Sequence, residues 1–291
     1  MSVERIIDQH EGFRSSIIIR AGFEISYDCP QPTPMLLMLS PHSSRLSDIM
    51  ATQRIDFFPT MSQQTYHDSF GNFCTRIVAP QGPLVIASSF NLRDSGQPDP
   101  QYPQAMQHPV DLLPDAMLLY LLGSRYCDTD KLMEIAWSRF GHLPPGWGLV
   151  QAVCDFTHRH IVFGYEHASA TRSASEAYAE QRGVCRDYAH LAITLCRCLN
   201  IPARYCTGWL GDIGVLPPHG PMDFAAWFEV WLGDRWHSFD ARNNTPRIGR
   251  ILMARGRDAT DVALVTTFGT CTMTGFRVVT DEVEPGEILP Y

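Results

Sequence analysis

Residues 181–204 read QRGVCRDYAHLAITLCRCLNIPAR, and this stretch predicts a loop, a cysteine and then a buried helix. Gly183 allows a chain reversal just before the helix, and Cys185 follows in the first helical turn. Unpaired backbone N–H groups and the helix dipole favour an anion there, which is a place where the pKa of a thiol is lowered. From residue 188 to residue 199 nearly every position is apolar or small, so we expect this helix to lie in a core.

Composition limits the classes of protein to which the chain can belong. Its 291 residues are 45% hydrophobic, which supports a substantial core in one large or two ordinary domains. The formal net charge of -8 comes without a long acidic or basic run, which argues against nucleic acid or an anionic membrane as a partner. No apolar run is long enough to span a bilayer, and residues 1–13 carry charges where a signal peptide is apolar, so we expect a cytoplasmic protein.

The cysteines and acidic residues point to no cofactor. Nine cysteines are an odd number, and none forms a paired CxxC array with zinc-finger spacing, so most are expected to be reduced core residues. The acidic residues lack the dense alternation of a calcium loop. A mixed metal site of Cys185, His219, Asp223 and Asp240 is conceivable, but no local spacing demands one. We therefore expect operation without a metal or cofactor.

The order of strand-like and helix-like segments predicts an α+β protein with two domains. Residues 1–93 contain runs of β-branched and aromatic residues and are expected to form a β-rich domain. Residues 94–114 are rich in proline and polar residues, which is typical of an extended linker. Residues 115–291 show helical spacing first and then strands, including a hairpin that turns at Gly233-Asp234.

A cysteine at the start of a buried helix, followed by strands with polar residues among aromatics, fits a thiol nucleophile that faces a base and an orienting group. Residues 235–242 read RWHSFDAR, and on a regular strand Asp240 shares a face with Trp236 while His237 points to the other face. His237 and Asp240 are therefore not expected to face one site together.

Four segments resemble, in order, the motifs of the transglutaminase-like family of papain-type cysteine enzymes. They are GVCRDYAHL (183–191), IPARYCTGW (201–209), AAWFEV (225–230) and WHSFDAR (236–242). The strand-rich first part is also similar to the N-terminal region often attached to bacterial members. The resemblance implies an all-β N-terminal domain followed by a papain-like core, in which a buried helix bearing the cysteine packs against an antiparallel sheet. It implies Cys185 as the nucleophile and Asp240 as the orienting carboxylate.

The position of the family's catalytic histidine is occupied by Ala225, which cannot accept a proton. One explanation is that a natural histidine has been replaced. A second is that another group is recruited, with His219 as the best candidate and Asp223 next. A third is that the chemistry has been lost and the protein binds a ligand. We rank recruitment or modified chemistry first because the rest of the motif series is intact.

Other polar and aromatic residues near these motifs have ordinary structural interpretations. His190 lies about 140° around the helix from Cys185 and is expected to be a core histidine, and Asp187 is expected to cap the first turn. Trp209 and Trp227 are expected to form core or cleft walls, although an indole N–H near the thiol would help to hold an oxyanion. Two arginines are candidates for reading an acidic substrate, namely Arg186 and Arg242.

The predicted function is acyl transfer or hydrolysis on an amide, peptide-like substrate through a thioester on Cys185. Hydrolysis and transamidation differ only in whether water or an amine reaches the thioester, and the sequence does not separate them. The alternative is a catalytically silent domain that binds a peptide or protein partner in the same cleft.

Overall fold

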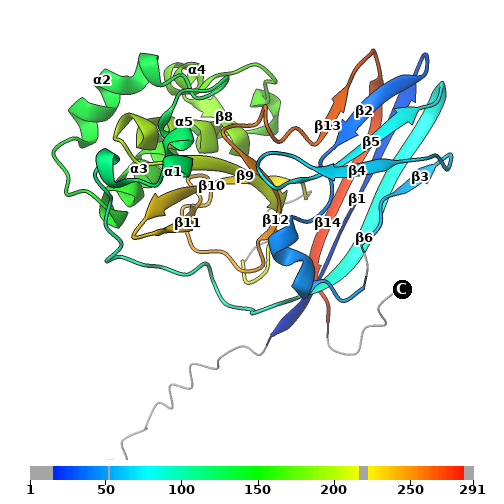
Figure 1. Ribbon diagram of the computed structural model, residues 1–291, viewed down its shortest axis with the longest axis horizontal. Coiled ribbons are helices and arrows are strands. Elements are labelled where there is room, and N and C mark those ends of the chain that lie inside the picture. The colour runs from blue at the N-terminus through cyan, green and yellow to red at the C-terminus, as the bar shows by residue number, and fades with distance from the viewer. Residues whose placement is uncertain (1–15, 52, 216–221, 285–291) are drawn as a thin grey trace, which may run out of the picture.

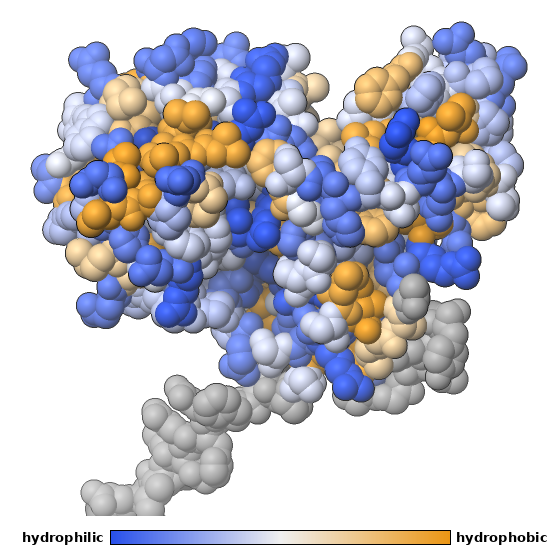
Figure 2. Space-filling model, in the orientation of Figure 1, coloured by the Kyte–Doolittle hydropathy of each residue, from blue (hydrophilic) through white to orange (hydrophobic). Residues whose placement is uncertain are grey.

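The computed structural model describes residues 16–51, 53–215 and 222–284. Figure 1 shows two lobes side by side. The sandwich lobe consists of strands from both ends of the chain, and the mixed lobe consists of a sheet with helices packed on one side. Figure 2 shows the lobes as two masses that meet along one side and separate towards the top of the view. The predicted α+β class is confirmed.

Two long strands form the centre of the sandwich lobe. Strands β1 (Ile17–Cys29) and β6 (Gly82–Asp94) pair antiparallel along their full lengths, and alternate side chains are buried in the core between two sheets. The sheets have the orders β14-β1-β6-β3 and β13-β2-β5-β4, with β14 (Thr272–Glu282), β3 (Asp56–Phe58), β13 (Val265–Thr267), β2 (Thr33–Leu37), β5 (Phe73–Ala79) and β4 (Gln64–His67).

The last strands of the chain differ from the predicted partition, in which residues 115–291 form one core. Strand β14 pairs antiparallel with β1, and β13 pairs with β2, so both belong to the sandwich lobe. The physical reason is that β1 and β2 would otherwise be sheet edges, and the returning chain supplies the missing backbone partners. Local patterning predicts that a segment is a strand but not which sheet it joins.

Helix α5 (Cys185–Cys198) is the centre of the mixed lobe. It packs on β9 (Ala203–Trp209) and β10 (Ala225–Leu232), and every residue from 187 to 198 is buried, as the sequence predicted. Asn200 takes a left-handed conformation (φ 63°), and the N–H of Ile201 donates to the carbonyl of Cys196 at 2.9 Å, which ends the helix as a C-cap.

The rest of the mixed lobe encloses this helix. The sheet has the order β11-β10-β9-β12, and all its pairs are antiparallel. Within the described ranges no helix is long and apolar enough to cross a bilayer. The remaining elements are η1 (Ser43–Asp48), η2 (Val110–Leu112), α1 (Asp115–Leu118), η3 (Leu119–Leu121), α2 (Thr129–Phe140), α3 (Trp147–His160), β7 (Val162–Phe163), η4 (Tyr165–His167), α4 (Ala174–Glu180), β8 (Arg182–Gly183), β11 (Arg235–Phe239) and β12 (Ile251–Gly256).

Residues 94–114 follow the mixed lobe closely instead of spanning open space between domains. Asp99 forms an ion pair with Arg250 at 2.8 Å, and Gln107 donates to the carbonyl of Leu199 at 2.9 Å. The segment is extended, as its prolines predict, but polar side chains fix it to the mixed lobe.

Candidate active site

Cys185 is positioned by a carboxylate cap at the start of α5. Asp187 is fully buried and accepts a hydrogen bond from the N–H of Val184 at 2.8 Å, and Arg172 pairs with the same carboxylate at 3.2 Å. The predicted capping role of Asp187 is therefore confirmed. Gly183 is needed for a different reason from the one predicted, because a Cβ there would lie 2.5 Å from the Asp187 carboxylate oxygen Oδ2. A side chain at position 183 would push the cap away from the helix.

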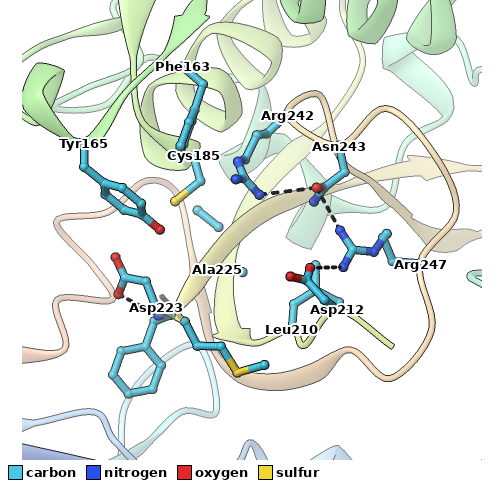
Figure 3. Close-up of a pocket in the computed structure, with 13 residues that line it drawn as sticks. Phe163, Tyr165, Cys185, Leu210, Asp212, Asp223, Ala225, Arg242, Asn243 and Arg247 are labelled. Carbon is cyan, nitrogen blue, oxygen red and sulfur yellow. Dashed lines mark hydrogen bonds and ion pairs between the residues drawn. The ribbon is translucent and has the colours of Figure 1, made fainter. Parts of the chain in front are cut away.

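The thiol of Cys185 lines a small cavity of about 60 Å3 next to the start of β10 (Figure 3). Figure 3 shows the sulfur, the Tyr165 hydroxyl and the Asp223 carboxylate directed towards the same space, with Ala225 beside them. The residues that line the cavity come from α5, β7, η4, the start of β10 and two loops, and they are Phe163, Tyr165, Cys185, Leu210, Asp212, Met222, Asp223, Phe224, Ala225, Ala226, Arg242, Asn243 and Arg247.

The thiol is held in its protonated form. Burial raises the pKa of Cys185 to about 11, and the negative charge of Asp223 acts in the same direction. The charge of Arg242 and a hydrogen bond from the backbone of Ala226 oppose this shift without cancelling it. The sequence led us to expect a lowered pKa at the helix N-terminus, and the structure differs because burial and the charge of Asp223 outweigh Arg242 and the Ala226 hydrogen bond.

Asp223 is the carboxylate at this site that is best suited to accept a proton. It lies two residues before Ala225 and accepts a hydrogen bond from the N–H of Phe224 at 2.6 Å. Burial raises its pKa, while that N–H and Arg242 lower it, with a net upward shift. No cation forms an ion pair with Asp223 within the part of the chain that the structure describes. Ala225 itself begins β10 opposite Gly208 and brings only a methyl group to the cavity.

Asp240 does not line this cavity and lines a separate pocket. Its carboxylate accepts hydrogen bonds from the N–H and the Nδ2 of Asn243 at 2.9 and 2.7 Å, and it pairs with Arg250 at 2.9 Å. Burial acts to raise the pKa of Asp240, but the charge of Arg250 and the bonds from Asn243 outweigh burial and lower it. Asp240 is thus an ionised, fully engaged carboxylate, and its role as an orienting group stays a prediction.

The arginines on the cavity wall are in two different states. Arg247 pairs with Asp212 at 3.0 Å and donates to Asn243 Oδ1 at 2.9 Å. Arg242 donates to the same Asn243 oxygen at 3.3 Å and stacks over the Phe163 ring at 4.2 Å, but no carboxylate among the described residues pairs with it. Arg242 is therefore a cation beside the thiol that is available to a ligand.

Three other predicted site residues lie away from the thiol. Trp209 is fully buried in the core of the sandwich lobe, and its indole N–H donates to the carbonyl of Gly22 at 3.3 Å, so it is not an oxyanion donor at Cys185. Trp227 is buried under the guanidinium of Arg250, 5.1 Å from the ring centre. Arg186 turns towards the 169–170 carbonyls and stacks over Tyr126.

The histidines provide no base to the cavity within the described residues. His219 lies outside those residues. His190 is a buried core residue, as predicted, stacked on Tyr126, with its Nε2 accepting the N–H of Ala259 at 3.2 Å. His237 bonds to the carbonyl of Leu232 at 3.0 Å and packs against Trp147 of α3, and it does not line the cavity.

Sequence analysis missed three titratable lining residues, namely Tyr165, Asp212 and Arg247. Tyr165 lies on a single 3-10 turn, and the other two lie in loops after strands, where no local pattern indicates that they converge. Within the described ranges no group of three or more histidine, cysteine, aspartate or glutamate side chains is placed to hold a metal ion.

Comparison with known proteins identifies relatives of this arrangement. Residues 141–241 match the model of the transglutaminase-like superfamily. An uncharacterized protein of Mycobacterium leprae is 35% identical over 94 residues, which cover 31% of this chain and 33% of that protein. An uncharacterized protein of Mycobacterium bovis is 31% identical over 152 residues, which cover 46% of each chain. The matched part of the chain thus spans less than half the length of these curated relatives.

A solved structure resembles the chain along almost its whole length. It is named as a putative cysteine protease from Cytophaga hutchinsonii, and it is 26% identical with a TM-score of 0.79 over 96% of this chain and 94% of that chain. The similarity therefore includes the sandwich lobe as well as the mixed lobe. The resemblance predicted from the four motifs is confirmed by these findings.

Proposed function

We propose, from the match of residues 141–241 to the transglutaminase-like superfamily, that the protein is a cysteine enzyme in which Cys185 accepts an acyl group from an amide or ester. One observation carries the proposal: Cys185 begins the buried helix α5 and, within the described residues, is the cysteine that lines the cavity. A thiol at that position meets a carbonyl group that enters the cavity, and the helix N-terminus stabilises the negative charge that develops on the carbonyl oxygen.

Asp223 is the proposed proton acceptor in place of the absent imidazole. As the Cys185 sulfur bonds to the carbonyl carbon, the thiol proton passes to the Asp223 carboxylate. The tetrahedral intermediate then collapses, the bond to the leaving amine or alcohol breaks, and that group takes the proton from Asp223. Water or a second amine attacks the resulting thioester, and Cys185 regains its proton when the product leaves.

The protonation states of Cys185 and Asp223 predict slow acyl transfer. With a pKa of about 11, only about one thiol in ten thousand is ionised near pH 7. The raised pKa of Asp223 makes it a stronger base than an ordinary aspartate, which partly offsets this deficit. We expect turnover well below that of a cysteine–histidine pair, for which the base alone typically contributes about 10²–10⁴-fold.

Ala225 favours a second candidate, in which the cavity binds a peptide or protein segment without turnover. The methyl group of Ala225 lines the cavity at the position of the family's histidine, and the thiol is protonated. In that case Arg242 and Asp223 recognise charged groups of the ligand, and Cys185 contributes only packing.

The test uses the full chain and 4-nitrophenyl acetate as an activated ester. We expect an acetyl group on Cys185 by peptide mass spectrometry and nitrophenol release that is lost in Cys185→Ser. If Cys185 is acetylated no faster than the half-exposed Cys271, the enzyme proposal is wrong and the binding candidate replaces it.

Asp223→Asn tests whether Asp223 acts as the base or only as a negative charge near the thiol. Removing the carboxylate lowers the thiol pKa, so alkylation by iodoacetamide becomes faster. Loss of the proton acceptor makes ester turnover slower, so the two rates change in opposite directions. If both rates rise, Asp223 is not the base. Ala225→His is the matched gain-of-function variant, in which we expect alkylation at neutral pH to increase by about tenfold or more.

A further inference from the structure

A second pair of cysteines, far from the cavity, is placed for a reaction with each other. Strand β14 pairs with β1 so that Asp28 lies opposite Thr272 and Tyr27 opposite Met273. Continuing this antiparallel register by one residue places Cys29 directly opposite Cys271. The bulge between Ser26 and Tyr27 is what sets this register, because it leaves one residue of β14 unpaired.

The side chains complete what the backbone register indicates. The Cys271 thiol donates a hydrogen bond to the Cys29 sulfur at a sulfur–sulfur distance of 2.9 Å, and the two residues are 242 positions apart in sequence. Among the described residues, this is the one pair of cysteine sulfurs joined by a hydrogen bond. Both cysteines are free thiols. Directly opposed residues of an antiparallel pair have Cβ atoms close to the separation that a disulfide requires.

The two thiols differ in access to solvent. Cys29 is fully buried at the end of β1, whereas Cys271 is partly exposed in the loop before β14. Burial raises the pKa of Cys29 to about 12, and its contact with Cys271 adds to the shift. A small reagent in solution therefore meets Cys271 first, and Cys29 reacts only with a sulfur already attached to its neighbour.

We propose that Cys29 and Cys271 form a reversible disulfide that fastens the start of β14 to the end of β1, with a low-molecular-weight disulfide such as oxidised glutathione as the oxidant. The Cys271 thiolate attacks one glutathione sulfur, which forms a mixed disulfide and releases one glutathione thiol. The Cys29 thiolate then attacks the Cys271 sulfur, and the second glutathione leaves. The protein loses two electrons and two protons, and oxidised glutathione gains them as two thiols.

The location of this pair gives the bond a consequence for the Cys185 cavity. Further along β14, Phe276 packs against Phe224 with ring centres 6.0 Å apart, and the N–H of Thr280 lies 3.1 Å from the Met222 sulfur. Met222 and Phe224 line the cavity. Fastening β14 thus holds the strand that supports this wall of the cavity.

The chain offers a clean readout for the bond. Trypsin places Cys29 in the peptide 21–45 and Cys271 in the peptide 258–277, and neither peptide contains another cysteine. We would incubate the native, reduced full chain with oxidised glutathione, block the remaining thiols with iodoacetamide and digest. The expected product is peptide 21–45 linked to peptide 258–277, which separates on reduction. The oxidised protein is expected to melt about 5 °C or more above the reduced protein.

Single variants test the order of reaction. In Cys29→Ser we expect Cys271 to retain one glutathione, whereas in Cys271→Ser we expect Cys29 to stay unmodified. Cys74→Ser removes a buried cysteine of the neighbouring sheet, whose thiol bonds to a carbonyl, and should leave the link intact. The proposal is overturned if Cys271 in the unaltered chain stops at the glutathione adduct, or if it links to Cys185 instead. Should Cys29→Ser fail to fold, the partly exposed Cys271→Ser still decides the question through the absent link and melting shift.

Discussion

Two arginines near opposite ends of helix α5 are in opposite states. Near the C-terminal end, Arg197 is 2% exposed, and its guanidinium donates to the carbonyls of Ala203 and Leu122 at 2.9–3.1 Å. At the N-terminal end, Arg242 lines the Cys185 cavity and has no carboxylate partner among the described residues. A buried charge whose donors are all used stabilises one conformation, whereas an unpaired charge beside a thiol is available to a ligand. We propose that this difference separates a polar residue that supports the fold from one that serves the cavity.

The largest effect on stability is expected when the fully hydrogen-bonded guanidinium of Arg197 is removed. Arg197→Met keeps an unbranched apolar side chain but leaves the carbonyls of Ala203, Leu122 and Arg257 without their donor. We expect the free energy of unfolding to fall by about 3–5 kcal/mol, as when one partner of a buried polar network is removed. Urea unfolding followed by circular dichroism measures it. A loss below about 1 kcal/mol would mean that these bonds are not structural.

The next largest effect is expected at the turn that carries the cap. In Gly183→Ala the new methyl group overlaps the Asp187 carboxylate, whose buried oxygens cannot retreat into solvent. We expect a loss of about 2 kcal/mol from the weakened cap and its displaced ion pair with Arg172. Gly148→Ala is the matched control, because nothing lies within 4 Å of the added methyl group in helix α3. That control should be neutral or slightly stabilising, since alanine favours helices over glycine.

The interior of α5 also predicts a dependence of stability on pH. Burial lowers the pKa of His190 to about 3, and the charge of Arg186 acts in the same direction, while Asp258 opposes it. Between that value and the unfolded pKa of about 6.5, the unfolded chain binds a proton that the folded chain does not, so stability falls as the pH falls. From this group alone we expect a loss of about 2 kcal/mol between about pH 7 and pH 5.

His190→Gln provides the control for that measurement. Glutamine has an acceptor that can receive the Ala259 N–H but does not titrate, so its stability should change less over the same pH range. His42 also has a pKa lowered by burial, to about 4, and remains in both proteins. The difference between the two unfolding curves therefore isolates His190. Equal pH dependence in both would assign the effect to other groups.

The sequence predicts features that depend on neighbouring residues, but not those that depend on residues far away along the chain. Helix α5 and the cap by Asp187 depend on neighbours within a few residues, and the structure has them as predicted. The sheet that β14 joins depends on pairing with β1, more than 240 residues away, and no local pattern specifies it. The pKa of Cys185 depends on burial of the thiol and on the charges of Asp223 and Arg242, and only the packed structure shows that burial prevails.

The smallest change in the free energy of unfolding is expected for a substitution of Arg242. This variant tests the comparison of the two arginines most directly. Arg242→Ala removes a guanidinium whose described contacts are one hydrogen bond to Asn243 and the stacking on Phe163. The free energy of unfolding should change by less than about 1 kcal/mol. The thiol should respond instead, because the positive charge of Arg242 lowers the pKa of Cys185. We expect the rate of iodoacetamide alkylation at a fixed pH of about 8 to fall several-fold, with Arg242→Lys retaining most of it.

This outcome would distinguish a charge that supports the fold from one that tunes the site. If Arg242→Ala lost as much stability as Arg197→Met, both arginines would support the fold. Arg242 would then not be a cation available to a ligand in the cavity. If stability and alkylation were both unchanged, Arg242 would be too distant or too solvated to act on the thiol. A loss of alkylation with stability preserved assigns Arg242 to the chemistry of Cys185, because a purely structural residue would not move the thiol pKa alone.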